Sequence, residues 1–418
     1  MLIEFRVKNY RSIKDEQILS LVAAKEKTNS ETHLIETGIK SIPALVRSAV
    51  LYGPNAGGKT NLVNALAFAR GVVAESAKMQ LGLKFFNLQP FRLDSKTAEE
   101  PTEFEFTFAE NGIRYQYGFI LSPERVYEEW LLVYKTSKPQ QWFARRFNPD
   151  TKQDDYEFGS FLTGQRRTWQ ESTRPNALFL STAIQLNSEQ LQPVFNWIVN
   201  KLVIFPASSI INPSFSIEML QSNEGKKTIE DFLASAGISF SNINLITRKG
   251  WAQTLHFNHL TGETNAPQRE EKDILTPQFL HETEHGSAIF ELHEESLGTQ
   301  RLFALAGPIM DILKQGRILI VDELDSSMHP LLVRYLVNVF HNPSVSRKGA
   351  QLIFTTHDTS LLNQEVFRRD QIWLVDKNRQ QATTVYPLTE FSPRKNEALE
   401  RGYLMGRYGA VPFFRNLN

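Results

Sequence analysis

The sequence predicts an α/β fold made of two lobes with a mainly helical insert between them. Three observations support this prediction. A glycine-rich loop joins an apolar strand to an amphipathic helix, an antiparallel β meander follows, and strands and helices alternate again toward the C-terminus. We expect an N-terminal lobe at residues 1–186, the insert at residues 187–240 and a C-terminal lobe at residues 241–418.

Composition limits the class of protein. The chain has 418 residues, 41% of them hydrophobic, which suffices for one large core. It carries 46 basic and 46 acidic residues, so its net charge does not attract a polyanion. Local basic patches stay open, for example around Arg145, Arg146, Arg166 and Arg167. The chain has no cysteine, which excludes disulfides, thiolate metal sites and thiol catalysis.

The N-terminus and the apolar runs predict where the protein resides. The first residues, MLIEFRVKNYRS, carry charges where a signal peptide is apolar. No apolar run reaches the ~20 residues of a membrane span. We therefore expect a soluble cytoplasmic protein with no membrane contact.

The elements of the N-terminal lobe follow from periodicity. Apolar residues such as Leu62, Leu66 and Ala69 recur at helical spacing after the glycine-rich loop. Residues 103–135 alternate between strand and turn signals, and the Asn111-Gly112 pair favours a tight hairpin turn. The strands expected before the meander cover residues 3–7, 17–22 and 48–52.

The rest of the chain shows a change of pattern. Residues 187–236 look helical and polar, except for a strand around Val203, and short strands are expected at roughly 243–294. No heptad run separates the two halves of the predicted nucleotide site, which argues against a coiled-coil arm. Strand–helix alternation resumes with RILIVDE, a helix from Leu331, QLIFTTHD and IWLVDK.

The segment GPNAGGKT at residues 53–60 fits the phosphate-loop pattern G-x-x-x-x-G-K-[ST]. Its glycines let backbone N–H groups face a phosphate, and the following helix presents its positive N-terminus to the same anion. Lys59 is predicted to reach the β- and γ-phosphates of ATP, and the Thr60 hydroxyl to bind Mg²⁺. The residues predicted to contact the nucleotide are Gly53, Asn55, Ala56, Gly57, Gly58, Lys59, Thr60 and Asn61.

A second part of the site is expected at the end of the apolar strand ILIV, which is followed by Asp322 and Glu323. Such a run is typical of a buried parallel strand, and ligands bind beyond the carboxyl ends of these strands. Asp322 is predicted to hold Mg²⁺, and Glu323 to orient and polarise the attacking water. The alternative, a strand ending in a solvated acidic turn, is disfavoured by the phosphate loop elsewhere in the chain.

Two segments around this acidic pair resemble motifs of ABC-type ATPases. Ser296-Leu297-Gly298-Thr299-Gln300 resembles the signature in which a serine and a glycine, here Ser296 and Gly298, cap the γ-phosphate of the opposite subunit. Leu297 and Thr299 depart from the usual Ser-Gly-Gly-Gln core, and an ordinary helix N-cap at Ser296 is the alternative. Asp325–Pro330 occupies the place of the D-loop, with His329 either as part of it or as a structural histidine.

Two further resemblances concern His357 and the N-terminus. The strand QLIFTT ends in His357, which resembles the switch histidine that senses the γ-phosphate, and we expect it to be catalytic with Glu323. The segment VKNYRSIKD resembles the opening segment of SMC, RecF and OLD heads. That resemblance implies nucleotide contact for Arg11, although a surface arginine in a turn is nearly as good an interpretation. Gln89 is one candidate among several for the Q-loop glutamine.

The whole chain resembles compact ABC-type ATPases of the RecF, SMC and OLD-like group. Within that group it resembles the phage-defence ATPases RloA and AbiLi most, and also PtuA of Septu and AriA of PARIS systems. The segments that carry the resemblance are GPNAGGKTN, the meander ending in YGFIL, TRPNALFLSTA, ESLGTQRLF, VDELDSSMHP, TTHD, RDQIWLVDK and YLMGRYGAVPFF.

The resemblance implies an ATP- and Mg²⁺-dependent homodimer, or a larger even-numbered oligomer, that hydrolyses ATP. It also implies an anti-phage role, by abortive infection, in which the chain controls a separate effector such as a nuclease. About 60 residues follow His357, fewer than the ~100 of a typical domain, so we expect no Toprim nuclease domain. His281, His285 and His293 suggest a metal site, but their alternating context favours a β-hairpin.

Three other functions are alternatives. A RecF-like DNA-repair ATPase would bind DNA directly, which zero net charge weakens and a local basic groove would restore. A second alternative is a scaffold protein that binds ATP but hydrolyses little of it, which the altered signature at Leu297 and Thr299 leaves possible. A transporter ATPase is disfavoured by the divergent signature and D-loop and by the lack of a membrane segment.

Overall fold

A six-stranded, mostly parallel sheet forms the middle of the molecule. The computed structural model describes residues 1–207, 211–254, 260–262, 264, 268–394 and 397–412. In strand order the sheet is β11-β15-β16-β5-β17-β18, and only β18 is antiparallel to its neighbour. The strands are Leu202–Phe205 (β11), Ile318–Val321 (β15), Gln351–Thr355 (β16), Ser48–Tyr52 (β5), Ile372–Lys377 (β17) and Thr383–Pro387 (β18).

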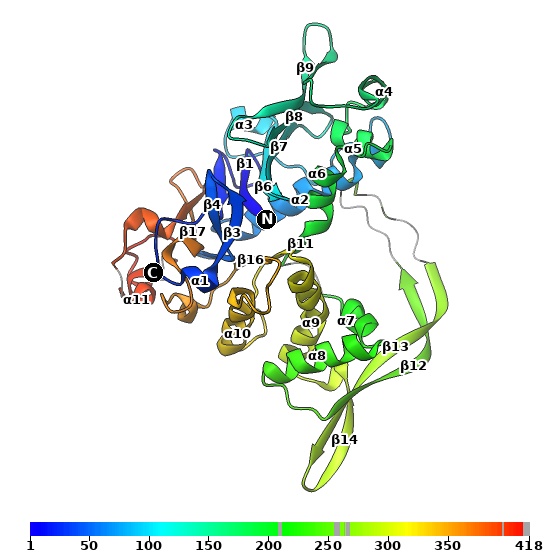
Figure 1. Cartoon of the computed structure of the whole chain (residues 1–418), viewed down its shortest axis with the longest axis vertical. Helices are drawn as coiled ribbons and strands as arrows, with labels where there is room; N and C mark the ends of the chain where they lie inside the picture. Colours follow the sequence, from blue (N-terminus) through cyan, green and yellow to red (C-terminus); the bar gives the residue numbers. More distant parts are fainter. Residues whose placement is uncertain (208–210, 255–259, 263, 265–267, 395–396, 413–418) are drawn as a thin grey trace, which may run out of the picture.

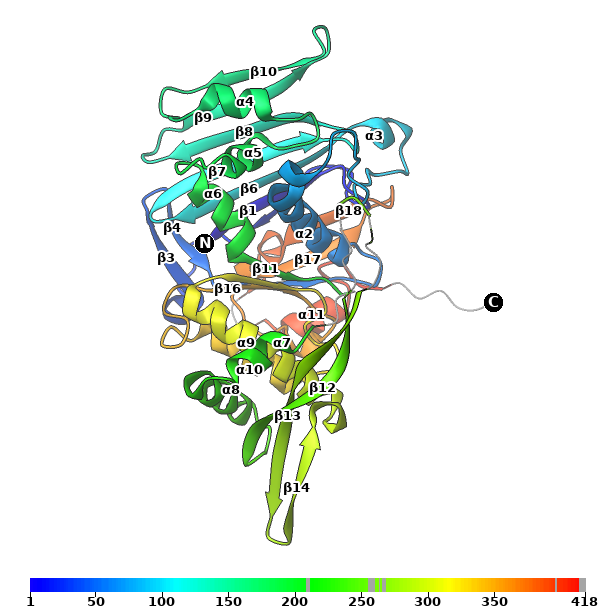
Figure 2. The ribbon, with the colours of Figure 1, turned by 90° about the vertical axis from the view of Figure 1, so that its right-hand side faces the viewer.

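A seven-stranded antiparallel sheet lies on one side of this parallel sheet and contains the predicted meander (Figures 1 and 2). Asn111 and Gly112 both have positive φ, 53° and 74°, as the predicted hairpin turn requires. In strand order, the sheet consists of Gln153–Phe158 (β10), Gln140–Asn148 (β9), Val126–Tyr134 (β8), Ile113–Leu121 (β7), Thr102–Glu110 (β6), Leu2–Lys8 (β1) and Gln17–Ser20 (β2).

Helix α2, Lys59–Glu75, fills the space between the two sheets. Its apolar residues, including Leu62 and Leu66, share one core with Ala49 and Leu51 of β5 and with the antiparallel sheet. The alternate residues of β5, Val50 and Tyr52, pack into a second core with α9 (Leu297–Gln315) and α10 (Pro330–His341). The parallel sheet is therefore covered on both faces, which explains why its strands are continuous apolar runs. This is the predicted α/β fold of an ABC-type P-loop ATPase head, with its β meander.

Several elements were not anticipated. These include a hairpin of β3 and β4 before β5 and short helices between the larger elements. The strands β9, β10 and β18 were not predicted either. The remaining unpredicted elements are α1 (Ser30–His33), β3 (Leu34–Ile39), β4 (Ile42–Val46), η1 (Ser76–Lys78), α3 (Ser95–Glu99), α4 (Arg166–Ser172), α5 (Phe179–Gln185), η4 (Thr359–Leu361), η5 (Arg369–Gln371) and η6 (Leu388–Phe391). The final helix is α11, Leu399–Leu404. The part of the chain that the structure describes holds no helix long and apolar enough to cross a membrane.

The expected insert contains helices and one strand. The strand around Val203 is β11, an edge of the parallel sheet. The helices here are α6 (Gln192–Asn196), η2 (Trp197–Lys201), α7 (Ser214–Met219) and α8 (Asn223–Ser235). The division of the chain at residues 187 and 240 stays a prediction.

The strands that follow form an arm at the end of the molecule opposite the antiparallel sheet (Figures 1 and 2). The expectation of short strands was wrong, because β12 (Asn242–Thr254) and β13 (Gln268–Thr283) pair over 13 residues. A third strand, β14 (Gly286–Glu291), pairs with the end of β13, and η3 (Leu292–Glu294) leads into α9. Much of the arm is exposed. The alternation of apolar and polar residues, from which the length of a half-buried strand is predicted, is therefore weak here.

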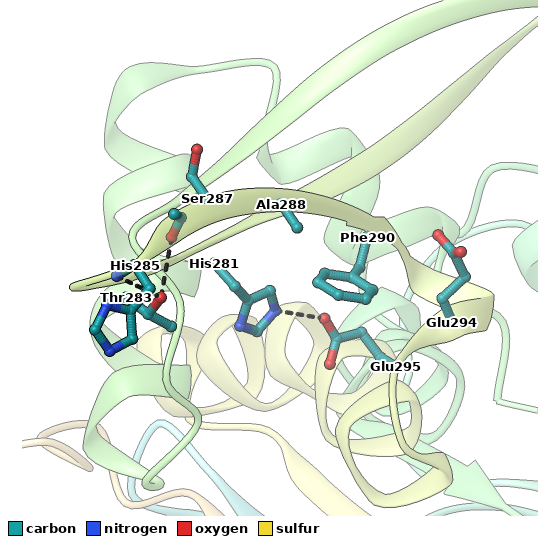
Figure 3. Close-up of a pocket in the computed structure, with 9 residues that line it drawn as sticks. His281, Thr283, His285, Ser287, Ala288, Phe290, Glu294 and Glu295 are labelled. Atoms are coloured by element: carbon teal, nitrogen blue, oxygen red, sulfur yellow. Dashed lines mark hydrogen bonds and ion pairs between the residues drawn. The ribbon is translucent and has the colours of Figure 1, made fainter.

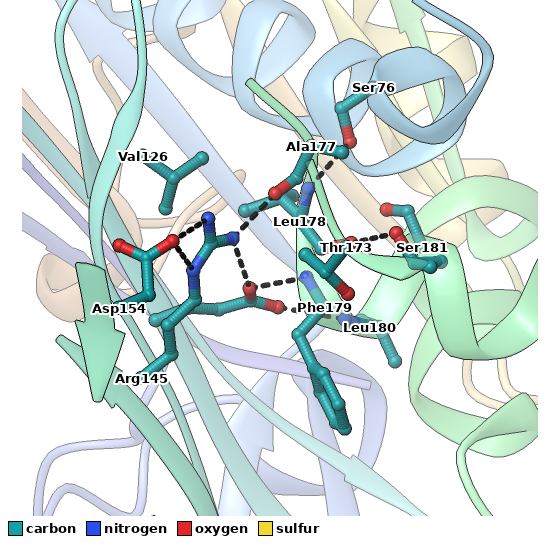
Figure 4. A network of polar contacts seen from close by, with 12 residues as sticks. Ser76, Val126, Arg145, Asp154, Thr173, Ala177, Leu178, Phe179, Leu180 and Ser181 are labelled. Atoms are coloured by element: carbon teal, nitrogen blue, oxygen red, sulfur yellow. Dashed lines mark hydrogen bonds and ion pairs between the residues drawn. The ribbon is translucent and has the colours of Figure 1, made fainter. Parts of the chain in front are cut away.

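A buried ion network fixes the meander to the segment TRPNALFLSTA (Figure 4). The Glu129 carboxylate accepts the N–H groups of Phe179 and Leu180 at 2.5 and 2.9 Å. The guanidinium of Arg145 lies 3.9 Å from Glu129 and 2.7 Å from Asp154. Arg145 is therefore a buried counter-ion. It is not part of the basic surface patch that the sequence analysis had left possible.

Two more arginines of that suggested patch are paired with acidic residues. Arg146 pairs with Glu128 at 3.3 Å, and Arg167 pairs with Glu171 at 2.8 Å. Acidic partners therefore reduce the net positive charge of this region, which weakens the case for direct DNA binding there.

Candidate functional site

The phosphate loop joins β5 to α2 and packs against β17 and β18. Gly58, the N-cap of α2, has a φ of 116°, a conformation that side chains rarely adopt. A Cβ atom at Gly58 would meet the hydroxyl of Thr383, and one at Gly53 would meet the carbonyl oxygen of Val375. These two glycines are therefore required for close packing of the loop on the sheet, in addition to the phosphate contact predicted for them.

Lys59 is buried at the first position of α2. Its Nζ donates to the carbonyl oxygens of Gly53 at 2.7 Å and Pro54 at 3.2 Å. Burial lowers the pKa of Lys59, and the nearby charges of Asp322 and Glu323 oppose that shift. The fold thus brings the loop lysine and the acidic strand end together, although they are more than 260 residues apart in the sequence.

The N-terminal segment lies beside the loop through Ser12. Asn61 Nδ2 donates to Ser12 Oγ at 2.6 Å, and Ser12 Oγ lies 2.8 Å from Thr383 Oγ1. Thr383 Oγ1 in turn donates to the Gly57 carbonyl oxygen at 3.0 Å. Asn61, predicted as a nucleotide contact, therefore also anchors the segment that contains Arg11.

Arg11 and Gln89 are brought together by the backbone. The Arg11 N–H donates to the Gln89 carbonyl oxygen at 2.7 Å, and Arg11 has a positive φ of 50°. Its guanidinium lies 5.4 Å from the centre of the Tyr10 ring. These contacts are compatible with both interpretations of Arg11, so its role and that of Gln89 stay predictions.

One side chain of the neighbouring strand, Thr355, organises the acidic pair. Thr355 Oγ1 donates to Asp322 Oδ1 at 2.5 Å and accepts the Glu323 N–H at 2.7 Å. Glu323 is exposed and has a φ of 53°, so the chain turns sharply where β15 ends. The sequence analysis did not identify Thr355, because its role depends on β15 and β16 being neighbours.

The second oxygen of Asp322 distinguishes this site from a solvated turn. Asp322 is 2% exposed, and its Oδ2 is buried with no hydrogen-bond partner among the described residues. Burying a carboxylate oxygen without a partner is costly, so this atom fits a cation ligand. The predicted partner ligand, the Thr60 hydroxyl, is likewise an oxygen of the kind that Mg²⁺ prefers, and its place in a metal site stays a prediction.

His357 follows β16 and is close to the same charges. Its backbone N–H donates to Asp325 Oδ2 at 3.2 Å. Desolvation and the charge of Lys59 lower the pKa of His357, whereas Asp325, Glu323 and Asp322 oppose the shift. The imidazole is thus favoured in its neutral form near neutral pH, in which one ring nitrogen donates and the other accepts.

Arg301, on α9, also reaches this site and was not singled out from the sequence. Its Nη2 donates to the Glu323 carbonyl oxygen at 2.8 Å, and its Nε is buried without a partner among the described residues. A small cavity is lined by Arg301, Asp322, Glu323 and Ser326, among other residues. The only sequence feature that could have identified Arg301 is its position directly after the segment SLGTQ.

Ser296 and His329 both cap helices. Ser296 Oγ accepts the Thr299 N–H at 3.1 Å at the start of α9. His329 Nδ1 accepts the Leu331 N–H at 3.2 Å at the start of α10. A Cβ atom at Gly298 would lie 3.0 Å from the Ser327 carbonyl oxygen, so the signature-like segment and the D-loop-like segment are in contact. The capping interpretation holds for both residues, and the predicted phosphate contact of Ser296 and Gly298 stays a prediction.

A cavity of about 690 Å³ lies next to the phosphate loop. Its lining includes Gly53 and Asn55 of the loop, His357, and Tyr403 and Leu404 of the C-terminal segment. The segment YLMGRYGAVPFF therefore contributes to the wall of the site, apart from residues 413 and 414, which lie outside the described residues.

The three histidines His281, His285 and His293 have separate surroundings in the part of the chain that the structure describes. His281 Nε2 lies 2.8 Å from Glu295 Oε1, and His293 Nδ1 lies 3.6 Å from Glu291 Oε2. His285 is exposed at the turn between β13 and β14. No group of three or more potential ligands is placed to hold a metal ion within the described residues, and the hairpin interpretation is confirmed.

The fold and the phosphate loop are those of an ATP-binding protein of the P-loop ATPase class. A family model described as "AAA domain, putative AbiEii toxin, Type IV TA system" matches residues 48–363, which is more than half of the chain. The chain belongs to this family. No curated protein matches it.

Two solved structures of SMC heads are similar to the chain. One is titled "Crystal structure of the SmcHead bound to the C-winged helix domain of ScpA", with 12% identity and a TM-score of 0.42, covering 92% of this chain and 97% of that one. The other is the "SMC head domain from Thermotoga maritima", with 12% identity and a TM-score of 0.41, covering 92% of this chain and 98% of that one.

Proposed function

We propose that the protein hydrolyses ATP with Mg²⁺ at this site, and that the hydrolysis cycle controls a separate effector in anti-phage defence. The observation that carries the hydrolysis is that Thr355 holds both Asp322 and Glu323. The second oxygen of Asp322 is buried without a partner among the described residues, whereas Glu323 is exposed. Of the two carboxylates, only Glu323 is accessible to water, which suits it to orient a nucleophile.

Each residue has a distinct part in the proposed reaction. The loop N–H groups, from Gly53 to Asn61, and Lys59 bind the phosphates, and Asp322 with Thr60 would hold Mg²⁺. A Mg²⁺ ion held there would neutralise negative charge on the phosphates. Glu323 orients the water, and His357 donates a hydrogen bond toward the γ-phosphate.

The proposed assembly is a homodimer or a larger even-numbered oligomer. Ser296 and Gly298 of a second copy would close over the γ-phosphate, which would complete the site only when ATP is bound. Support comes from the exposed start of α9, where Ser296 and Leu297 both face solvent. Arg301 on the same helix donates to the Glu323 carbonyl oxygen, so closure at the helix start would act on the backbone of the catalytic residue.

The proposed role in defence rests on likeness. The family description names a putative AbiEii toxin and a type IV TA system. The chain also resembles RloA and AbiLi in the segments quoted above. A nuclease is the effector that this resemblance favours, in a cytoplasmic complex without membrane contact.

Replacing Glu323 by Gln tests the proposal directly. Glu323→Gln keeps the shape of the side chain but removes the charge that polarises water, so ATP turnover should fall by about 10²–10³-fold while ATP binding persists. Turnover by phosphate release and binding by equilibrium dialysis would be measured on the same sample. Wild-type turnover in this variant would exclude the role given to Glu323 and favour a binding scaffold.

A matched control separates the loss of this carboxylate from a general effect of removing a surface charge. Glu218, on α7, is exposed and lies outside the residues assigned to the site. Glu218→Gln should therefore turn over ATP at the wild-type rate.

A separate measurement addresses the RecF-like alternative. Salt-sensitive DNA binding that strengthens with ATP would support that alternative.

A further inference from the structure

The tip of the arm carries an unpaired strand edge next to an apolar groove. β14 pairs with β13 on one side, and no partner strand is found on its other side within the described residues. Ala288 and Phe290 on this strand are exposed, Phe290 to 38%. An exposed edge with apolar side chains is a template for pairing with another chain, which proteins otherwise blunt with charge, proline or cover.

The groove beside this edge has a volume of about 570 Å³ (Figure 3). Strand alternation places Ala288 and Phe290 of β14 on the same face as His281 of β13, because Ala288 is paired with His281. Figure 3 shows the rings of His281 and Phe290 side by side, with Glu294 and Glu295 at one end of the groove. A strand added to β14 would thus have a pocket for its alternate side chains.

The negative charge around β14 indicates which kind of chain can pair with its free edge. Between residues 276 and 300 the chain has five glutamates and no lysine or arginine. Arg248 pairs with Glu291 at 2.6 Å, but no ion pair is found for Glu282, Glu284 or Glu294 within the described residues. A second copy of this chain would bring like charges together across the edge, whereas a basic segment would meet opposite charge.

We propose that β14 is a docking edge for an extended basic segment of a partner protein, which adds a fourth strand to the arm and places apolar side chains in the groove. The identity of that partner as the effector rests on the proposed function, but the docking edge itself does not. The site is also close to the signature-like segment. Glu295, which lines the groove and contacts His281, directly precedes Ser296, and its carbonyl oxygen accepts a hydrogen bond from Gln300 at 2.7 Å.

The test uses the full-length protein and a fluorescein-labelled peptide in which lysine alternates with valine. We expect it to bind, while peptides alternating glutamate with valine, or lysine with proline, bind at least about tenfold more weakly. The first control reverses the charge, and the second removes the N–H groups that a strand needs. Fluorescence anisotropy at two salt concentrations would measure the three affinities.

Two tryptophan variants place the peptide on the structure. Ala288→Trp fills the groove from an exposed position and should weaken the lysine–valine peptide by about tenfold or more. Ile289→Trp, on the opposite face of the same strand, should change the affinity by less than about threefold. Equal loss in both variants, or none in either, would overturn the proposal, as would equal binding of the glutamate–valine peptide.

Failure of this inference is distinguishable from failure of the proposed function. ATP binding and turnover would be measured on the same samples, and Lys59→Ala should abolish ATP binding without changing peptide affinity. If Ala288→Trp instead abolished self-association of the chain, the edge would pair with a second copy and the basic-partner proposal would be wrong.

Discussion

At the scale of single residues, Thr355 shows how the site depends on the fold. The loop residues Gly53–Asn61 could be predicted, because their chemistry follows from spacing within one segment. Thr355 and Arg301 could not, since a hydrogen bond to Asp322 or Glu323 arises only when β16 and α9 are placed beside β15. The Asp322 oxygen that has no partner among the described residues is likewise a property of packing, and the sequence alone does not indicate it.

Replacing Thr355 by valine tests this organising role. Thr355→Val keeps the shape but removes the hydroxyl that binds Asp322 and Glu323, so the Mg²⁺ concentration for half-maximal turnover should rise about 10- to 100-fold. The free energy of unfolding should fall by about 1–3 kcal/mol, since the buried partners lose their hydrogen bonds. ATP turnover against Mg²⁺ concentration and urea unfolding would measure the two effects.

The neighbouring threonine is a matched control for this variant. Thr356 is buried as well, but its hydroxyl accepts the Asp358 N–H and does not contact the acidic pair. Thr356→Val should lower stability without a change in the Mg²⁺ requirement. An equal rise in both variants would show that Thr355 has no specific influence on the ion.

At the scale of elements, the Glu129 carboxylate joins β8 to α5. It accepts two backbone N–H groups of α5 and the Tyr117 hydroxyl, and it faces Arg145. Glu129→Gln replaces one acceptor oxygen with a donor and leaves Arg145 with one less counter-charge. The free energy of unfolding should fall by about 3–5 kcal/mol, which thermal or urea unfolding would measure.

The adjacent residue Glu128 provides the control for Glu129. Its pair with Arg146 is at the surface, so Glu128→Gln should change stability by less than about 1 kcal/mol. A small effect in both variants would mean that the carboxylate at 129 is not what fixes α5 to the meander.

A second contact between elements is a stacked pair of buried histidines. His33 of α1 and His341 of α10 have ring centres 3.8 Å apart, and they hydrogen-bond to Gln371 of η5 and Ser48 of β5 respectively. Burial lowers the pKa of both histidines. The charge of Arg47 favours the same direction at both histidines, and the charge of Arg368 does so at His33. The hydrogen bond to Gln371 and the charge of Asp370 oppose the lowering of the pKa of His33.

The lowered pKa values predict the pH dependence of stability. The folded state binds fewer protons than the unfolded chain, whose histidines titrate near a pKa of about 6.5. The contribution to stability is therefore complete above that pH and is lost as the pH falls below it, by up to about 1.4 kcal/mol per pH unit for each proton. Urea unfolding from pH 7.5 downward should show this loss, and it should be shallower in His33→Gln but unchanged in the exposed-site control His285→Gln.

The strands of the two sheets were predicted better than the arm, for a physical reason. β5, β15 and β16 are buried on both faces, so each is a continuous apolar run that stands out in the sequence. β12 and β13 are long and largely exposed, with charged residues such as Glu270, Glu271 and Lys272, and such a strand has little periodicity to detect. The free edge of β14 belongs to this poorly predicted part.

At the scale of the whole molecule, Ser296 has two proposed roles: it caps α9 in its own subunit, and it contacts the γ-phosphate bound to a second copy. Its Oγ caps α9, and that alone explains a serine at this position. Ser296→Asn and Ser296→Asp both retain an acceptor that can cap the helix, so both should leave the stability of the subunit within about 0.5 kcal/mol. They differ in charge, and only Asp would repel the γ-phosphate of a second copy.

Comparing these two variants therefore separates capping from assembly. In the Glu323→Gln background with ATP and Mg²⁺, Ser296→Asn should still form a dimer or a larger even-numbered oligomer by light scattering, and Ser296→Asp should remain monomeric. In the otherwise unmodified chain, ATP turnover per subunit should rise with protein concentration for Ser296→Asn and stay low for Ser296→Asp. If the two variants assemble and turn over ATP alike, Ser296 is a helix cap alone, and the site must be completed by other residues of the second copy.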